Sequence, residues 1–199
     1  MRYELKDPSK AKELFAGWNE TLIFSCLQNI MGKIYVTEPE RPKSALAFVG
    51  CFGFYAGTPD RQLVMDKPDG FAIMIPQNKG WAMLIEECYP SAGKVTRYAI
   101  KKDTVFDRSM SRGEMEKLPA GYELKRIDAD IYDQCLADPA TRDFVAAFES
   151  KEKYLRLGRG MVILKGGKIV SGASSYTRYK EGIEIEVDTV EPERRKHLA

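Results

Sequence analysis

The sequence has little of what metal sites and disulfide frameworks require. Its 199 residues include one histidine and four cysteines, Cys26, Cys51, Cys88 and Cys135, which stand far apart and form no CxxC pair. A zinc site needs clustered thiolates or imidazoles, so no metal is expected. Each cysteine lies in an apolar stretch, and four reduced, mostly buried thiols are typical of a cytoplasmic protein. We therefore predict a cytoplasmic location.

Long apolar runs and an excess of basic residues are also missing. The segment Met1–Pro8 has no apolar core, so no secretory signal is predicted. No run approaches the about 18 apolar residues of a membrane-spanning helix. With 31 Lys and Arg against 29 Asp and Glu, the formal net charge is only +2. Nucleic-acid-binding proteins usually carry a clear basic excess. Neither a membrane nor a nucleic acid is an expected partner.

Several sequence motifs of common enzyme classes are absent. The segment 50–54 has two glycines, but it lacks the GxGxxG spacing that precedes a helix in dinucleotide-binding proteins. There is no phosphate-binding P-loop, no GxSxG and no HExxH motif. Cys51 has no histidine partner for nucleophilic catalysis, because the only histidine is His197. These absences argue against nucleotide-dependent dehydrogenases, the common hydrolases and zinc proteases.

The residues that are present describe an ordinary globular protein. Hydrophobic residues make up 44% and charged residues 30% of the chain, and this length allows one large domain or two of about 100 residues. The first half mixes helices and strands. Asp7 and Asn19 are predicted N-caps of two helices. Strands are predicted over 33–37, 45–55 (one strand or a pair), 70–76 and 96–101, and a buried helix over 81–88.

A polar segment divides the chain. Residues 108–121 contain Ser, Gly, Pro and several charges, with a short helix indicated only over 114–118. We place a domain boundary near residue 118, which gives an N-terminal α/β domain over 1–118 and a second domain over 119–199. The second domain is predicted to hold a strand over 122–127, a helix capped by Asp128, a second helix from Asp138-Pro139, and strands over 160–164, 169–176 and 183–189.

Two features of the second domain are especially clear. Gly166-Gly167 predicts a two-residue hairpin, because both central positions of a type I′ turn need positive φ. Residues 183–189 alternate strictly, which predicts a half-buried strand. One face carries Ile183, Ile185 and Val187, and the other carries Glu184, Glu186 and Asp188.

The order strand, helix, helix, hairpin, strand and basic turn resembles the GNAT superfamily of N-acetyltransferases. The superfamily pattern after this strand is Gln/Arg-x-x-Gly-x-Gly/Ala. Arg194, Leu198 and Ala199 fit the pattern, and His197 stands where glycine is usual. The chain looks most like the zwittermicin-A-resistance-type enzymes, which also carry a non-catalytic N-terminal half. The resemblance implies an α/β (α+β) fold with a mixed, mostly antiparallel sheet flanked by helices, preceded by a smaller α/β N-terminal domain.

The resemblance also implies acetyl-CoA as co-substrate. In the superfamily, the backbone of the alternating strand pairs with the pantetheine arm. The residues of this strand that the resemblance assigns to that contact are Val187 and Thr189. The pyrophosphate lies at the helix that follows, where unpaired amides and a partial positive charge favour anions. The corresponding residues are Arg194, Arg195, Lys196, His197, Leu198 and Ala199. The alternative from the residues alone is a solvated basic tail.

Acetyl transfer to a primary amine of a small molecule requires the ammonium group to lose a proton. Superfamily members often use a glutamate of this strand as the base, and the resemblance makes Glu184 the first candidate and Glu186 the second, since both project from one face. The general acid is usually a tyrosine beyond the pyrophosphate helix, a position that lies past residue 199. The alternative is that both carboxylates merely form the polar face of the strand. An acyl-CoA-binding module without turnover is the rival function.

The place where the sequence stops bears on the second domain. The predicted pyrophosphate helix starts at Arg194, so the acetyltransferase domain over 119–199 is expected to be truncated there, with one apolar face of its sheet exposed. The N-terminal half could cover the acceptor side of the cleft or form a homodimer contact.

Overall fold

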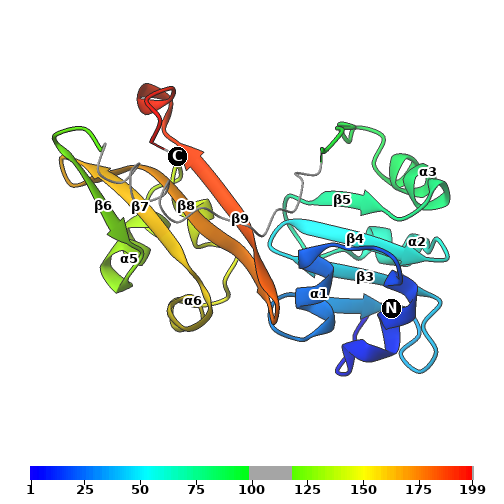
Figure 1. Ribbon diagram of the computed structural model, residues 1–199. Coiled ribbons are helices and arrows are strands. Elements are labelled where there is room, and N and C mark those ends of the chain that lie inside the picture. The colour runs from blue at the N-terminus through cyan, green and yellow to red at the C-terminus, as the bar shows by residue number, and fades with distance from the viewer. Residues whose placement is uncertain (99–117, 199) are drawn as a thin grey trace.

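The computed structural model describes residues 1–98 and 118–198, and within them the chain forms two sheets (Figure 1). The five strands of the first sheet follow chain order, and only β4 and β5 are parallel. They are β1 (Tyr3–Glu4), β2 (Lys33–Val36), β3 (Ser44–Val49), β4 (Phe52–Gly57) and β5 (Ile73–Pro76). The second sheet is antiparallel throughout. It contains β6 (Tyr122–Arg126), β7 (Gly160–Lys165), β8 (Lys168–Tyr179) and β9 (Gly182–Thr189). The predicted fold class is confirmed.

Helices cover both faces of the first sheet. Ala47 and Phe54 pack with η1 (Pro8–Phe15) and α1 (Thr21–Leu27), whereas Leu46 and Tyr55 pack with α2 (Arg61–Met65) and α3 (Lys79–Cys88). A strand buried on both faces is apolar along its whole length. This explains the uninterrupted apolar run over 45–55, which forms β3, a tight turn and β4.

The starts of the first two helices were predicted with mixed success. Asp7 caps η1 by accepting the backbone N–H of Ser9, as expected, although the segment is a 3-10 helix. The prediction of Asn19 as the next cap is wrong, because α1 begins at Thr21 after Glu20. The apolar spacing misled here, since α1 ends at Leu27 and the apolar residues after it lie in the turn that leads to β2.

In the second half, α5 (Ala129–Ala137) begins as predicted, with the Asp128 carboxylate accepting two backbone N–H groups. The predicted helix after Pro139 is wrong. Phe144, Val145 and Phe148 are buried there, but in the short 3-10 turn η2 (Arg142–Phe144) and the bends after it. The helix α6 (Lys151–Leu157) was not predicted.

Some predictions lie partly or wholly outside the described residues. Of the strand predicted over 96–101, residues 96–98 are not in a strand and the rest are not described. Of the predicted linker over 108–121, the structure describes residues 118–121. Of the helix indicated over 114–118, only residue 118 is among the described residues.

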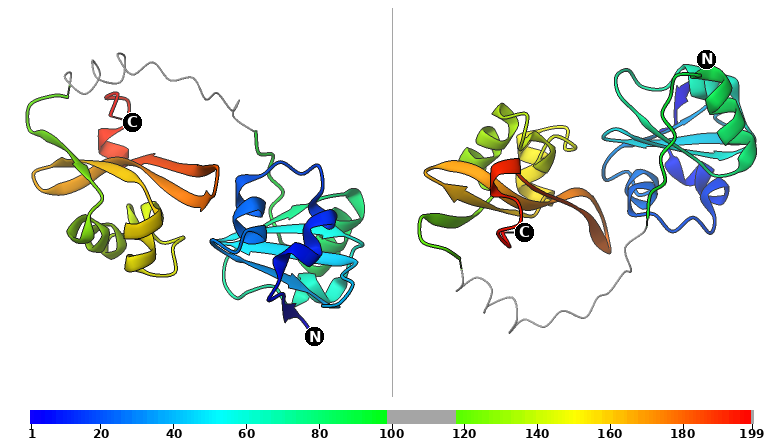
Figure 2. Two further views of the ribbon diagram at one scale, coloured as in Figure 1. Left: turned by 60° about the horizontal axis from the view of Figure 1, so that its bottom comes forward. Right: turned by 90° about the horizontal axis from the view of Figure 1, so that it is seen from above.

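The second sheet has two different faces. Gly166 and Gly167 both have positive φ, 57° and 79°, which confirms the predicted hairpin between β7 and β8. Figure 2 shows α5 and α6 on one side of this sheet and η3 (Glu191–Glu193) with the C-terminal segment on the other. On β9 we call the side of Glu184, Glu186 and Asp188 the helix face. We call the side of Ile183, Ile185 and Val187 the open face.

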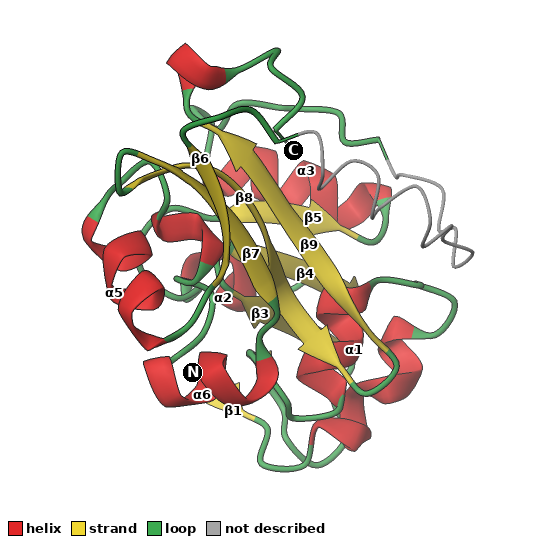
Figure 3. Ribbon diagram, turned by 60° about the vertical axis from the view of Figure 1, so that its left-hand side comes forward, coloured by secondary structure: helices red, strands yellow, loops and turns green. Residues whose placement is uncertain are grey.

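Helix α1 connects the two sheets, and it lies beside the hairpin end of β8 and β9 (Figure 3). The Ser25 hydroxyl donates to the Arg178 carbonyl at 2.6 Å. The Gln28 side chain donates to Glu181 and accepts the Lys180 backbone N–H at 2.8 Å. These polar contacts fix the hairpin end of β9 against the first half of the chain.

A second contact involves a β-bulge at Tyr176. The register between β8 and β9 shifts between Ser175 and Thr177, which leaves Tyr176 as the extra residue. Its hydroxyl accepts the backbone N–H of Cys51 at 3.1 Å in the turn between β3 and β4. Gly50 in the same turn has φ 58°, and a Cβ there would lie 2.0 Å from the Tyr176 hydroxyl oxygen. The bulge thus directs Tyr176 into a turn that requires glycine.

Candidate functional site

The helix face of β9 holds the candidate carboxylates. Glu184 lies opposite Thr177 and Glu186 lies opposite Ser174 in the β8–β9 register, and both glutamates are partly buried. Ser174 is buried and its hydroxyl is 2.8 Å from that of Tyr154 in α6. Glu184 and Glu186 therefore sit at the border between a packed layer of side chains and solvent.

Glu186 lines a small pocket of about 120 Å³. The other lining residues come from the α5–η2 segment and from the end of β9: Pro139, Ala140, Thr141, Asp143, Phe144 and Asp188. Burial raises the pKa of Glu186, and the negative charges of Asp143 and Asp188 raise it further. A carboxylate with a raised pKa accepts protons better near neutral pH than an exposed one does. The pocket can therefore hold a proton-accepting group next to a space for a small polar group.

The open face of β9 is apolar and exposed. Ile185 is 60% and Val187 51% exposed. β9 also lies at the edge of its sheet, and within residues 1–98 and 118–198 no strand pairs with its outer side. Thr189, at the end of β9, shares a 2.7 Å hydrogen bond with the Ser171 hydroxyl. An edge strand with unpaired backbone groups can pair with another extended chain.

The basic turn follows directly. The Arg194 Nε donates to the Thr189 carbonyl at 2.9 Å, and its guanidinium is 3.5 Å from the Asp188 carboxylate. The predicted helix does not start within residues 194–198, because Arg195 and His197 have φ of 63° and 57°. These values belong to the left-handed region, which a right-handed helix cannot contain. The His197 backbone thus adopts the conformation that glycine, the usual residue of the pattern, adopts most easily.

One acidic residue anchors this basic segment. Glu193 is 8% exposed. Its carboxylate accepts hydrogen bonds from the Tyr122 hydroxyl at 2.5 Å and from the Lys165 and Lys196 ammonium groups at 2.7 Å each. The bonds from Lys165, Lys196 and Tyr122 hold the pKa of Glu193 at about 2. Glu193 therefore joins the turn after β9 to β6 and β7.

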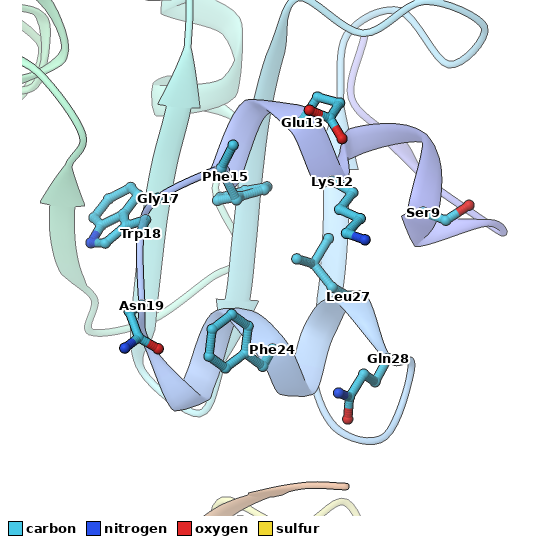
Figure 4. Close-up of a pocket in the computed structure, with 11 residues that line it drawn as sticks. Ser9, Lys12, Glu13, Phe15, Gly17, Trp18, Asn19, Phe24, Leu27 and Gln28 are labelled. Carbon is cyan, nitrogen blue, oxygen red and sulfur yellow. The ribbon is translucent and has the colours of Figure 1, made fainter. Parts of the chain in front are cut away.

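A larger pocket lies away from β9. It has a volume of about 520 Å³ and lies between η1 and α1, where Phe15, Trp18, Phe24 and Leu27 supply apolar surface (Figure 4). Its lining comes from residues 9–28 and includes none of the predicted site residues. We place the candidate site at β9, because the titratable groups meet there.

The part of the chain that the structure describes contains no group of three or more His, Cys, Asp and Glu side chains arranged to hold a metal ion. It also contains no helix that is long and apolar enough to cross a membrane.

Comparison with known proteins decides the family. The family model described as GNAT acetyltransferase matches residues 12–199. The chain belongs to the GNAT acetyltransferase family. Its fold is similar to the crystal structure of a GCN5-related N-acetyltransferase-like protein from Streptococcus suis, with a TM-score of 0.90 and 43% sequence identity. The match covers 97% of this chain and 79% of that one. No match was found among the curated proteins.

In this GNAT acetyltransferase, the structure brings most of the predicted site residues to one end of β9. Arg194, Arg195, Lys196, His197 and Leu198 follow β9 in one short segment, and Ala199 lies outside the described residues. Glu184 lies nearer the hairpin end of β9, opposite Thr177.

Two residues of this acetyltransferase were missed by sequence reasoning. Asp143 was hidden in a segment predicted as a helix, and only its contribution to the pocket beside Glu186 makes it notable. Glu193 looked like part of a solvated charged run, because its partners Tyr122 and Lys165 are 71 and 28 residues away in the sequence. The one local indication of its role was an acidic and a basic residue three positions apart, Glu193 and Lys196, a spacing that favours an ion pair.

Proposed function

We propose that this acetyltransferase transfers the acetyl group of acetyl-CoA to the primary amine of a small molecule, in a ternary complex and with Glu186 as general base. The observation that carries the proposal is the pocket between η2 and β9, where Glu186 is partly buried and has a raised pKa. Following the resemblance noted from the sequence, we further propose a zwittermicin-A-resistance-type enzyme that acts in the cytoplasm on an antibiotic or another small amine.

Glu186 would receive the proton that the acceptor ammonium must lose, directly or through a water molecule. Asp143 and Asp188, which line the same pocket, would attract the positively charged acceptor before that proton is lost. Glu184, the first candidate from the sequence, is the next carboxylate along the same face and would serve if the acceptor binds nearer to α1. The thiolate that leaves also needs a proton, and we assign that role to no described residue.

The segment after β9 fits the anionic end of acetyl-CoA. Arg195 is exposed and has no hydrogen bond or ion pair within the described residues, so its charge is available to a phosphate. Arg194 and Lys196 add charge next to it, and the left-handed backbone at Arg195 and His197 turns successive amides around a short loop. Acetyl-CoA would supply a thioester carbonyl that an amine can attack. The edge of β9 around Val187 and Thr189 would pair with its pantetheine arm and offer backbone N–H groups to the oxyanion.

The first experiment measures binding and turnover separately. Acetyl-CoA is titrated into the protein by calorimetry, and release of free thiol is followed over a panel of primary amines. Binding together with thiol release supports the proposal. Binding without release from any amine supports the rival, a module that holds acyl-CoA without turnover. No heat and no shift of the melting temperature would refute both.

The second experiment tests the base. Glu186→Gln is expected to lower kcat by about 10²–10⁴-fold, the range typical of a lost general base, with acetyl-CoA affinity unchanged. Activity of the unaltered protein should rise with pH through the raised pKa of Glu186, and this acidic limb should disappear in the variant. Glu184→Gln is the matched control on the same face. A large loss in Glu184→Gln with little change in Glu186→Gln would move the role to Glu184.

A further inference from the structure

The turn after β9 begins next to a carboxylate, that of Glu193, which is held by three side chains of the protein. Glu193 is the last residue of η3, directly before the basic run Arg194–Lys196. Its side chain is 10% exposed and lies among groups of other strands. Tyr122 and Lys165, which hold it, are directly opposite each other in the β6–β7 register. The Lys165 ammonium also lies 4.9 Å from the centre of the Tyr122 ring. The pairing of β6 and β7 thus places two hydrogen-bond donors, Tyr122 and Lys165, side by side for the Glu193 carboxylate.

The geometry points to Glu193 as a positioning residue that holds the proposed phosphate-binding turn in place by fixing it to β6 and β7. This inference rests on the proposed function, because it assigns a role toward the acetyl-CoA pyrophosphate. Glu193 does not act on that group, since its two oxygens are occupied by three donors. It acts through the backbone that starts the turn, and through Lys196, whose ammonium it holds at 2.7 Å.

Two observations explain why such an anchor is needed. First, Arg195 and His197 both have left-handed backbone conformations, which non-glycine residues adopt only when the surroundings hold them there. Second, the other contacts of the segment with the sheet reach β8 and β9: the Val190 N–H donates to the Val170 carbonyl of β8 at 2.9 Å, and the Arg194 side chain contacts Thr189 and Asp188 of β9. Among the hydrogen bonds and ion pairs of the described residues, those of Glu193 tie the segment to β6 and β7, across the sheet from β9. It therefore fixes the direction in which the turn leaves the sheet.

The test compares two ligands that differ in the part that the turn would bind. Acetyl-CoA carries the pyrophosphate, whereas acetyl-pantetheine has the same thioester and arm without it. Glu193→Gln keeps the shape of the side chain and removes its charge. We expect this variant to lose affinity for acetyl-CoA by about tenfold or more, as is typical when charge-assisted hydrogen bonds are lost. Its affinity for acetyl-pantetheine should stay the same. Both affinities are measured by calorimetry.

Matched variants separate positioning from general damage. Glu191→Gln is the control, because Glu191 is exposed in the same 3-10 turn and its side chain has no hydrogen bond or ion pair within the described residues. It should bind both ligands like the unaltered protein. Lys165→Met should reproduce the selective loss of acetyl-CoA affinity, and the double variant Glu193→Gln/Lys165→Met should lose no more than the larger single loss, because both residues act through one contact.

Four results are distinguishable. A selective loss for acetyl-CoA supports the inference. Unchanged acetyl-CoA affinity in Glu193→Gln overturns it, and so does an equal loss for both ligands, which would indicate a purely structural role. If the unaltered protein binds neither ligand, the proposed function itself fails. A melting curve of each variant confirms that it is folded before the titration.

Discussion

The two sheets differ in how many of their faces the described residues cover. In the first sheet, β4 is buried along its four central residues, because helices pack on both sides. In the second sheet, β9 has its two glutamates partly buried on the helix face and its apolar residues exposed on the open face. Hydrophobic burial alone would favour the opposite arrangement. Burial therefore explains the first sheet, whereas β9 keeps its carboxylates at a pocket and its apolar side chains available for contact.

The largest effect on stability should come from the first sheet. Trp81 is fully buried against Tyr55, and its indole N–H donates to the Gly57 carbonyl at 2.9 Å. Trp81→Ala should lower the free energy of unfolding by about 3–5 kcal/mol. Ile185→Ala on the open face should change it by about 0.5 kcal/mol or less. Urea denaturation followed by circular dichroism measures both.

If Ile185→Ala destabilised the protein as much as Trp81→Ala, the contrast between the covered first sheet and the exposed face of β9 would be wrong. It would mean that the open face is covered in solution, for example by a second copy of the chain. Sedimentation of the same sample would then show a dimer.

Two neighbouring residues of β8, Gly172 and Ala173, allow the two faces of the second sheet to be compared within one strand. A Cβ at Gly172 would lie 3.0 Å from Phe144 and Val162 on the helix face, whereas Ala173 opposes Val187 on the open face and is exposed. Gly172→Val should therefore destabilise the protein by about 1–3 kcal/mol through overpacking. Ala173→Val should be neutral or slightly stabilising, since valine favours strands. Thermal unfolding of the two variants gives the answer, and equal shifts would contradict the assignment of the faces.

The smallest expected effect is the change in stability at acidic pH that comes from Glu193. The hydrogen bonds from Lys165, Lys196 and Tyr122 lower the pKa of Glu193 from 4.5 to about 2. A lowered carboxyl pKa stabilises the folded state above the unfolded value, and this contribution is lost as the pH falls from about 4.5 toward 2. The difference in urea midpoint between the unaltered protein and Glu193→Gln should be present at neutral pH and shrink over this range.

Glu191→Gln again serves as control and should show no such pH-dependent difference. A difference for Glu193→Gln that stays constant down to the acidic end would show that the ionised carboxylate is not what stabilises this turn.

Local chemistry in the sequence predicted much of this fold. The Gly166-Gly167 turn, the Asp128 cap and the alternation of β9 each depend on neighbouring residues only, and the structure bears out all three. Helix α6 was missed because only Tyr154 of its seven residues is buried, so it has no apolar periodicity. The 3-10 turn at η2 was taken for a helix because its buried residues happen to have helical spacing.

The candidate site was less accessible to sequence reasoning. The roles of the strand and the basic turn came from the family resemblance, but the order of preference between Glu184 and Glu186 needed the pocket that η2 forms beside β9. The bulge at Tyr176 and the partners of Glu193 depend on residues far away in the sequence. No local pattern could have indicated them.

The contact between α1 and β8 has a consequence for synthesis. Ser25 and Arg178 are 153 residues apart in the chain. A ribosome adds about 5–20 residues per second, so α1 emerges roughly 8–30 s before the carbonyl that its serine binds. During that interval the first sheet can fold as a unit, while the surface of α1 that later holds β8 stays uncovered. The order of synthesis thus exposes this part of α1 to solvent until β8 has been made.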